Sequence, residues 1–504
     1  MNQISDSPHI SNDAASFVVV ANRLPIDVRI DDEGDVHWEE SPGGLVSALA
    51  PVLHGREAVW IGWSGVATEV DAIPAFRTPA MMGSYHLVDV PLSASMVEQY
   101  YEGFSNSTLW PLYHDRIVAP EYHRDTWNAY VEVNLHFAEH TADVAAPNAT
   151  VWVHDYQLQL VPSMLRALRP DLLIGFYLHI PFPPAELFLQ LPWRQRIVEG
   201  MLGADLIGFQ TPFGANNFCE VTSQLMGYES ESASADGGWI DVGTPSFNMT
   251  NSVQFRPARN HVARRVQVDS FPISIDVASL EELAASPKVQ QRALDIRRDL
   301  GDPKFLLLGV DRMDYTKGIE VRLRAFVELL EDDMLDPAHT VLLQIATPSR
   351  EQVEEYQRLR EDIELLVGRA AGALGEIGQV PLRYMYSGLP REELAAFYVA
   401  ADVMLVTPLR DGMNLVAKEY VATRIDDSGS LVLSEFAGAA LELPQAWLVN
   451  PYSLESVKEA IMTALGTTPE DRRRRMAAMR THLREHDVER WAREFLDALA
   501  ATGS

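Results

Sequence analysis

The chain has 504 residues, and its 41 basic and 71 acidic side chains give a formal net charge of −30. This length is too great for one hydrophobic core and predicts two or three domains. The acidity argues against nucleic acid and against an anionic membrane as partners. The single cysteine, Cys219, excludes an intrachain disulfide and is typical of a cytoplasmic protein. No apolar run approaches the ~20 residues of a membrane span.

In chain order, residues 1–16 come first; they are polar and are expected to form a disordered tail. Short apolar runs then alternate with helical patterns, as in successive β–α units. Helices are predicted over residues 158–168 and 192–202. Strands in this part are predicted over residues 17–23, 58–65, 86–92, 150–156, 173–180, 206–211 and 265–271.

The second part of the chain repeats this alternation. Its strands are predicted over residues 304–311, 340–346, 382–388, 402–408, 430–436 and 446–451. These runs are almost continuously apolar, as expected for strands that are covered on both faces. The sequence therefore predicts an α/β fold with two doubly wound domains, residues 17–272 and 273–485, with the boundary near Pro272.

Three other segments differ in composition. Residues 229–260 are polar and rich in Gly, Ser and Asn, and they are predicted to be a surface insertion. Residues 470–485 are charged and helical, and the run Arg472–Arg475 indicates a solvated helix face. The last helix, Val488–Ala500 within residues 486–504, has apolar side chains on one side, so it is expected to dock on another element.

The segment from Gly309 to Gly318 places two cations in a loop between a predicted strand and a predicted helix. Arg312 and Lys317 lie five positions apart in this loop. In an open α/β sheet, loops at this end of the strands bind ligands. Arginine offers a planar fork and lysine a point charge, and both suit phosphate. The segment therefore predicts an anion-binding loop.

A second segment, Arg410 to Tyr420, follows another predicted strand. Its helix is predicted to start at Met413, so the backbone amides of Met413, Asn414 and Leu415 would face a ligand anion. Asp411 and Glu419 could accept hydrogen bonds from hydroxyl groups on two parts of one long ligand. The alternative is that Asp411 only caps the helix and that Glu419 pairs with Lys418 on the surface.

Loops in the first part supply further polar residues. They are Arg23 after the first strand, the glycine pair Gly43 and Gly44, Asp155 and His179 at two strand ends, and the aromatic residues Tyr101 and Trp110. In the second part, Arg350 likewise follows a predicted strand. Each also has an ordinary explanation, because most glycine pairs are turns and the histidine and aromatic residues could belong to the core. If the two sheets face each other, these loops form one cleft suited to a nucleotide sugar and a second, phosphorylated sugar.

Five stretches together carry a family resemblance over about residues 17–500: HDYQL, HIPFP, GVDRMDYTKG, TPSR and RDGMNLVAKEY. They resemble glycosyltransferase family 20, the trehalose-6-phosphate synthases. The resemblance implies two facing Rossmann-like domains, the GT-B arrangement, with the active site in the cleft between them. It also implies that the last helix crosses back to the first domain. The implied reaction transfers glucose, with retention, from UDP-, ADP- or GDP-glucose to glucose 6-phosphate.

The resemblance also implies a role for each candidate residue. Donor contacts would come from Gly43, Gly44, His179, Arg312, Lys317, Asp411, Met413, Asn414, Leu415 and Glu419, of which His179, Arg312, Lys317 and Asp411 would be catalytic. Acceptor contacts would come from Arg23, Tyr101, Trp110, Asp155 and Arg350. No cofactor and no essential metal are expected, and the family implies a cytoplasmic homotetramer.

Three alternatives stay open at this point. A glucosylglycerol-phosphate synthase would keep the donor site and change the acceptor. A non-catalytic, phosphosugar-binding regulatory relative would have lost some of the donor residues, all of which are present. A pyridoxal-phosphate phosphorylase would need a Schiff-base lysine, and Lys418 is the only lysine near the appropriate helix.

Overall fold

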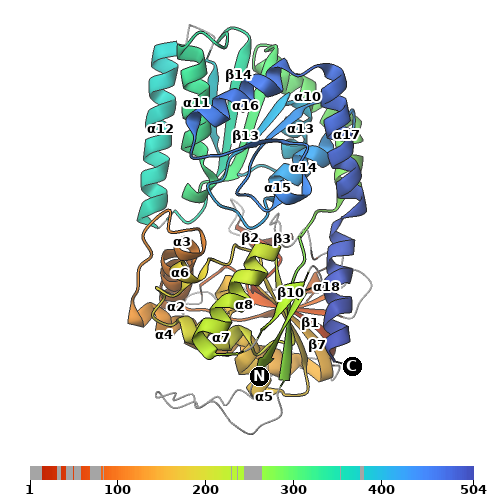
Figure 1. Ribbon diagram of the computed structural model, residues 1–504. Coiled ribbons are helices and arrows are strands. Elements are labelled where there is room, and N and C mark those ends of the chain that lie inside the picture. The colour runs from red at the N-terminus through yellow and green to blue at the C-terminus, as the bar shows by residue number, and fades with distance from the viewer. Residues whose placement is uncertain are drawn as a thin grey trace, which may run out of the picture.

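The computed structural model describes residues 14–30, 36–40, 49, 58–67, 81–82, 85–228, 230–234, 237–242, 264–351, 353–374 and 380–503. These residues form two α/β units stacked end to end, each with helices around a central sheet (Figure 1). Among the described residues, no helix is long and apolar enough to cross a membrane.

The N-terminal unit contains a ten-stranded sheet in the order β10-β11-β12-β9-β8-β7-β1-β4-β6-β5. The strands from β12 to β6 in this order are parallel, whereas β10, β11 and β5 pair antiparallel. Their bounds are β1 Ala15–Arg23, β4 Ala58–Trp63, β5 Met81–Met82, β6 Tyr85–Asp89, β7 Ala145–His154, β8 Leu173–Leu178, β9 Leu206–Phe209, β10 Ser230–Ser234, β11 Gly237–Val242 and β12 Arg264–Ser270.

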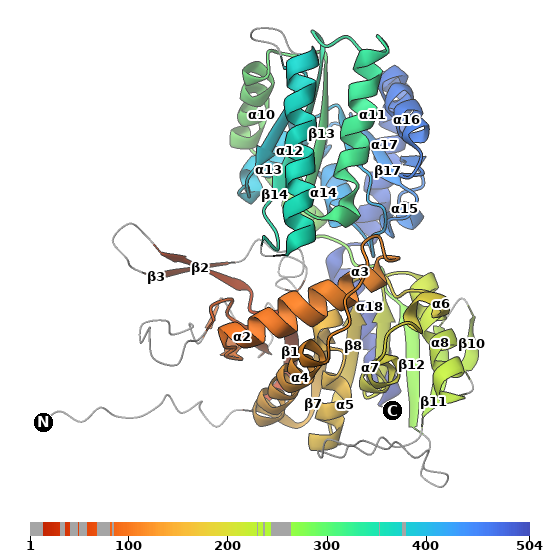
Figure 2. The same ribbon diagram turned by 90° about the vertical axis from the view of Figure 1, so that its left-hand side faces the viewer.

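A separate antiparallel ribbon, β2 (Ile26–Ile30) with β3 (Val36–Glu40), stands away from this sheet (Figure 2). The other elements of the unit are helical. They are α2 Ala94–Met96, the π-helix η1 Val97–Leu109, α3 Trp110–Tyr113, α4 Arg124–Val144, the 3-10 turn η2 Tyr156–Leu158, α5 Val161–Leu168, α6 Ala185–Phe188, α7 Arg194–Met201 and α8 Pro212–Met226.

The C-terminal unit contains a six-stranded, wholly parallel sheet in the order β15-β14-β13-β16-β17-β18. Its strands are β13 Phe305–Arg312, β14 Thr340–Thr347, β15 Leu382–Tyr386, β16 Val403–Val406, β17 Ser430–Ser434 and β18 Trp447–Val449. Its helical elements are α9 Val277–Ala285, α10 Pro287–Asp299, the 3-10 turn η3 Tyr315–Lys317, α11 Ile319–Glu331, α12 Glu354–Leu374, α13 Arg391–Ala400, α14 Leu415–Thr423, α15 Ala439–Glu442, α16 Leu454–Gly466 and α17 Pro469–Glu485.

Local sequence explains where several helices begin. Helices α8, α10 and α17 each start with a proline that follows Ser or Thr, and that hydroxyl accepts a hydrogen bond from the backbone N–H three residues later. Proline lacks only a donor that the first helical turn leaves unpaired, and the hydroxyl satisfies another.

The last helix, α18 (Val488–Thr502), leaves the C-terminal unit and lies beside the N-terminal sheet (Figure 1). The ring of Phe495 stacks on Trp152 of β7, with centroids 4.7 Å apart. Gly175 and Gly208 admit this ring, because a Cβ on either glycine would lie 2.8 Å from it. One hydrophobic cluster therefore runs from the N-terminal sheet through α18 into the C-terminal unit.

Each strand predicted from apolar runs is present within a few residues of its expected bounds. The predicted surface insertion differs from expectation, because residues within 229–260 form β10 and β11 and extend the N-terminal sheet. These strands are polar, and β10 lies at the sheet edge, so the apolar pattern of a buried strand is absent there.

Candidate functional site

The carboxyl ends of the two parallel sheets face each other, and the candidate residues lie at that junction. His154 ends β7, and Arg312 ends β13. Gly412 of the C-terminal unit lies directly against the backbone carbonyl of His179. A Cβ at position 412 would overlap that carbonyl oxygen, so only glycine permits this approach. The site is therefore built from both units.

Lys317 and Asp411 form an ion pair, with 2.6 Å between Nζ and Oδ2. Their side chains are 11% and 14% exposed, so little water screens the pair. Burial alone would raise the pKa of Asp411, but Lys317, His114 and Asn414 together outweigh burial and hold that pKa below its usual value. The carboxylate of Asp411 is thus held in its charged form beside Lys317.

Arg312 is exposed at the end of β13. Its guanidinium carbon lies 5.8 Å from the ring centroid of Trp110, which belongs to the N-terminal unit. Within the described part of the chain, Arg312 forms no salt bridge. An exposed arginine in this position can receive an anionic ligand.

The remaining residues of the predicted anion loop are structural. Asp311 forms a buried ion pair with Arg322 of α11, and a Cβ at Gly309 would lie 2.8 Å from the Nε atom of Arg322. Asp314 accepts hydrogen bonds from the backbone N–H and the hydroxyl of Thr316, at 2.9 and 2.8 Å. These contacts hold the loop that presents the two cations.

Asn414, and not Asp411, is the N-cap residue of α14. Its φ is 90°, its Oδ1 accepts from the N–H of Ala417 at 3.0 Å, and its Nδ2 donates to Asp411 Oδ2 at 3.1 Å. The alternative that Asp411 merely caps α14 is therefore wrong. The helix begins at Leu415 rather than at Met413, because Asn414 is the cap and lies in the turn.

Glu419 and Lys418 do not pair with each other, so the surface-pair alternative is also wrong. Glu419 accepts a hydrogen bond from the Tyr398 hydroxyl at 3.0 Å, and burial raises the pKa of Glu419. Lys418 is fully buried; its Nζ lies 2.6 Å from Glu442 and donates to the carbonyl of Ile273 at 2.7 Å. Lys418 therefore has a structural role and joins α14 to the segment between the two units.

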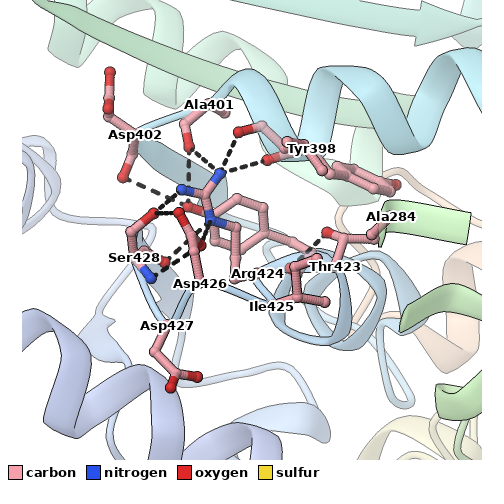
Figure 3. Close-up of polar contacts among 12 residues, drawn as sticks. Ala284, Tyr398, Ala401, Asp402, Thr423, Arg424, Ile425, Asp426, Asp427 and Ser428 are labelled. Carbon is pink, nitrogen blue, oxygen red and sulfur yellow. Dashed lines mark hydrogen bonds and ion pairs between the residues drawn. The ribbon is translucent and has the colours of Figure 1, made fainter. Parts of the chain in front are cut away.

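The helix that carries Tyr398 is itself fixed by Arg424 (Figure 3). The Nη1 atom of Arg424 donates to the carbonyls of Tyr398 and Ala401, at 3.1 and 3.0 Å, and its Nε donates to that of Ser428 at 3.1 Å. The bonds to Tyr398 and Ala401 satisfy carbonyls at the end of α13, which its own helix leaves unpaired. Tyr398 thus holds Glu419 from a rigid element.

Arg350 joins the two units through Trp110 and Tyr156. Its guanidinium carbon lies 3.9 Å from the Trp110 ring centroid, and its Nη2 donates to the Tyr156 hydroxyl at 3.0 Å. Its Nη1 contacts the Tyr356 hydroxyl and lies 3.4 Å from Asp314 Oδ2. Stacking of the planar guanidinium on an aromatic face favours arginine over lysine here.

The other predicted acceptor residues lie nearby in the N-terminal unit. Arg23 stacks on Trp63 at 5.2 Å, and Tyr101 packs against the same tryptophan, with centroids 6.4 Å apart. Asp155 accepts a hydrogen bond from the N–H of His179 at 3.1 Å. Burial raises the pKa of Asp155 to about 6.

Several buried polar atoms at this junction have no partner. Within the described residues, they include the Nε1 of Trp110, the Nε2 of His154 and the Nε of Arg350. An unpaired buried donor or acceptor costs about 1–3 kcal/mol. Atoms of this kind also occur elsewhere in both units, for example in Glu199 and Tyr384. The described residues contain no cluster of His, Cys, Asp and Glu that could hold a metal ion.

The sequence model of glycosyltransferase family 20 matches residues 15–501. The chain belongs to this family. A relative named trehalose-6-phosphate synthase, from Mycolicibacterium vanbaalenii, is 58% identical over 494 residues, which cover 98% of each chain. The family resemblance and the predicted fold class, two facing parallel α/β domains, are confirmed.

Two solved structures of similar proteins contain ligands. The alpha,alpha-trehalose-phosphate synthase (UDP-forming) from Burkholderia xenovorans in complex with glucose 6-phosphate has a TM-score of 0.84 at 32% identity, covering 96% of this chain and all of that one (100%). A structure described as trehalose-6-phosphate from E. coli bound with UDP-2-fluoro glucose has a TM-score of 0.82 at 32% identity, with coverages of 96% and 98%.

The structure brings most of the candidate residues to the junction of the two units. Their individual roles stay predictions. Gly43 and Gly44 lie outside the described residues. Sequence reasoning missed Tyr156, Asp314 and Tyr356, the partners of Arg350. Tyr156 follows Asp155 in the HDYQL stretch, and its position beside that candidate residue could have indicated it.

Proposed function

We propose that the chain is a retaining glucosyltransferase that moves glucose from a nucleoside-diphosphate glucose to glucose 6-phosphate. The products would be α,α-trehalose 6-phosphate and the nucleoside diphosphate. The observation that carries the proposal is that three basic side chains and two polar ones lie at the junction of the two units. They are Arg312, Lys317, Arg350, Asp155 and His179. Three cations suit the diphosphate of one substrate and the phosphate of the other. The names and ligands of the similar proteins support the same pair of substrates.

On the donor side, Arg312 and Lys317 would bind the diphosphate, and Glu419 the ribose hydroxyls. The bond between the anomeric carbon and the diphosphate oxygen breaks, and negative charge accumulates on the leaving group. Two preorganised cations, of which Lys317 is shielded from water, stabilise that charge. We propose that they do so without an essential metal ion, so that turnover persists after treatment with a chelator.

On the acceptor side, Arg23, Tyr101, Trp110 and Arg350 would hold the phosphate of glucose 6-phosphate, and Asp155 its sugar hydroxyls. The acceptor's anomeric hydroxyl forms the new bond to glucose, and its proton passes to the departing phosphate oxygen on the same face. Such a front-face route retains the anomeric configuration without a covalent enzyme intermediate. Asp411 and His179 would orient the glucose during transfer.

The test is a donor panel of UDP-, ADP- and GDP-glucose with glucose 6-phosphate, in which nucleoside diphosphate release and the product's anomeric configuration by NMR are measured. Formation of an α,α-linked phosphodisaccharide supports the proposal. Turnover with glycerol 3-phosphate but not with glucose 6-phosphate would instead assign a glucosylglycerol-phosphate synthase. Absence of nucleoside diphosphate release with every donor would assign a binding protein. The homotetramer and the cytoplasmic location stay predictions, and light scattering of the purified protein tests the first.

A further inference from the structure

Gln210 is a buried amide that links His179 to the segment joining the two units. It follows β9 and is 4% exposed. Its Oε1 accepts a hydrogen bond from the backbone N–H of Ile273 at 3.0 Å and lies 2.9 Å from the Tyr177 hydroxyl, which also contacts the carbonyl of Phe271. A backbone N–H can only donate, so the amide atom that faces Ile273 must be the oxygen. The Nε2 of Gln210 therefore faces His179.

This orientation determines which ring nitrogens carry protons in a pair of histidines. The Nε2 of Gln210 lies 3.4 Å from both the Nδ1 and the carbonyl oxygen of His179. Because that Nε2 donates, the Nδ1 of His179 accepts, and the ring proton of His179 lies on its own Nε2. That atom is 3.1 Å from the Nδ1 of His154, which therefore accepts in turn.

Both imidazoles are held neutral, so each carries one ring proton. Burial lowers the pKa of His179 to about 3 and the pKa of His154 well below its usual value. The three side chains stand at the ends of the neighbouring parallel strands β7, β8 and β9. The direction of their hydrogen bonds is set by one backbone N–H at the domain junction.

The same junction residue also contacts the C-terminal unit. The carbonyl of Ile273 accepts from the Nζ of Lys418, on α14, at 2.7 Å. Two residues on, the carbonyl of Ile275 accepts from the N–H of Val488, at 3.1 Å, where the chain crosses back. A continuous set of contacts thus runs from α14, which carries Glu419, through Ile273 and Gln210 to His179.

We propose that Gln210 is a positioning residue for glucosyl transfer: it fixes the tautomer and orientation of His179 and makes both depend on the junction at Ile273. The proposal rests on the function proposed above. Docking of α14 through Lys418 and alignment of His179 through Gln210 then share one residue, because Lys418 binds the carbonyl of Ile273 and Gln210 binds its N–H. His179 is held in its working orientation only when both contacts to Ile273 are made.

Two measurements test the proposal. Histidine tautomers are read by NMR from protein labelled with 15N-histidine, with the His179 signal assigned by its loss in His179→Asn. In the unmodified protein, His179 is expected in the Nε2–H form. In Gln210→Glu, measured at a pH where its carboxyl group is ionised, an oxygen that cannot donate faces Nδ1, so the ring proton is expected on Nδ1 and the bond to His154 reverses.

In kinetic assays of Gln210→Glu, kcat is expected to fall by about 100-fold, because loss of alignment at the reacting centre has effects of that order. The KM for each substrate should change by less than about threefold, since Gln210 is 4% exposed and its side chain binds protein groups. Gln290→Glu is the control, because the Nε2 of Gln290 also donates to a backbone carbonyl, that of Ala284 at 2.7 Å, but Gln290 lies on α10 and does not contact His179. Its kcat should stay within about threefold of the unmodified protein.

The outcomes separate the two proposals. An Nδ1–H tautomer for His179 in the unmodified protein overturns the positioning role, whether or not Gln210→Glu folds. An unchanged kcat in a folded Gln210→Glu overturns it as well. If the unmodified protein transfers no glucose to glucose 6-phosphate, the proposed function fails, while the tautomer measurement still decides whether Gln210 sets His179.

Discussion

Replacing Lys317 with methionine should impair both catalysis and stability, and the two effects can be separated. The substitution keeps an unbranched side chain of similar length and removes the ammonium group that lies 2.6 Å from Asp411. Asp411 then stays in a site where burial raises its pKa, without the cation that now holds that pKa down. Its carboxylate keeps one hydrogen-bond donor, Asn414.

The magnitudes follow from the burial of the pair. Loss of one preorganised charge stabiliser lowers turnover by about 10²–10³-fold. Removal of one partner from a buried ion pair costs about 3 kcal/mol, because the other charge is left uncompensated. For a domain of this size, that corresponds to roughly 6–12 °C in the apparent Tm. Adding Asp411→Asn removes the stranded charge and should restore most of the lost stability without restoring turnover.

The assay measures nucleoside diphosphate release and thermal unfolding for Lys317→Met, Asp411→Asn and the double variant. Lys304→Met serves as the control for removal of a lysine, because Lys304 is exposed before β13. If turnover recovers in step with stability in the double variant, Lys317 acts only as a structural partner of Asp411. The assignment of Lys317 to the leaving diphosphate would then be wrong.

Three further predictions concern other parts of the molecule. Tyr398→Phe removes the hydroxyl that orients Glu419; a hydrogen bond to a charged group contributes about 1.5–3 kcal/mol, so the KM for the donor should rise by at least about tenfold while kcat is retained. Burial raises the pKa of Asp155 to about 6 in the folded state, so the protonated side chain favours folding at low pH and this contribution is lost as pH rises through 6. The free energy of unfolding of Asp155→Asn should therefore exceed that of the unmodified protein by up to about 3 kcal/mol at pH 7–8 and should equal it near pH 4, as measured by unfolding from pH 4 to 8. Gly175→Ala should cost about 1–3 kcal/mol by displacing α18, whereas Gly368→Ala, in open space on α12, should be stabilising; equal effects in thermal unfolding would refute the packing argument.

Local sequence patterns predicted the elements and the kind of ligand but not the partners of each charge. Arg312 and Lys317 were singled out as the cations of one loop, and their role in binding stays a prediction, whereas Asp311 pairs with Arg322 and Asp314 binds Thr316. Nothing in the local pattern distinguishes these aspartates from a binding residue. Their partners come from elements that pack beside the loop only in the fold.

The amino-acid sequence by itself determined that this protein has two sheets with buried parallel strands. Near-continuous apolar runs must be shielded from water on both faces, and layers of helices provide that shielding. The sequence also determined the family, because five specific stretches occur together. Only the tertiary structure decided that Arg350 stacks on Trp110, that Gly412 meets His179 and that Gln210 joins His179 to Ile273. Each of these contacts joins residues more than 30 positions apart, and side-chain periodicity reports which face of an element is buried but never which distant residue covers it.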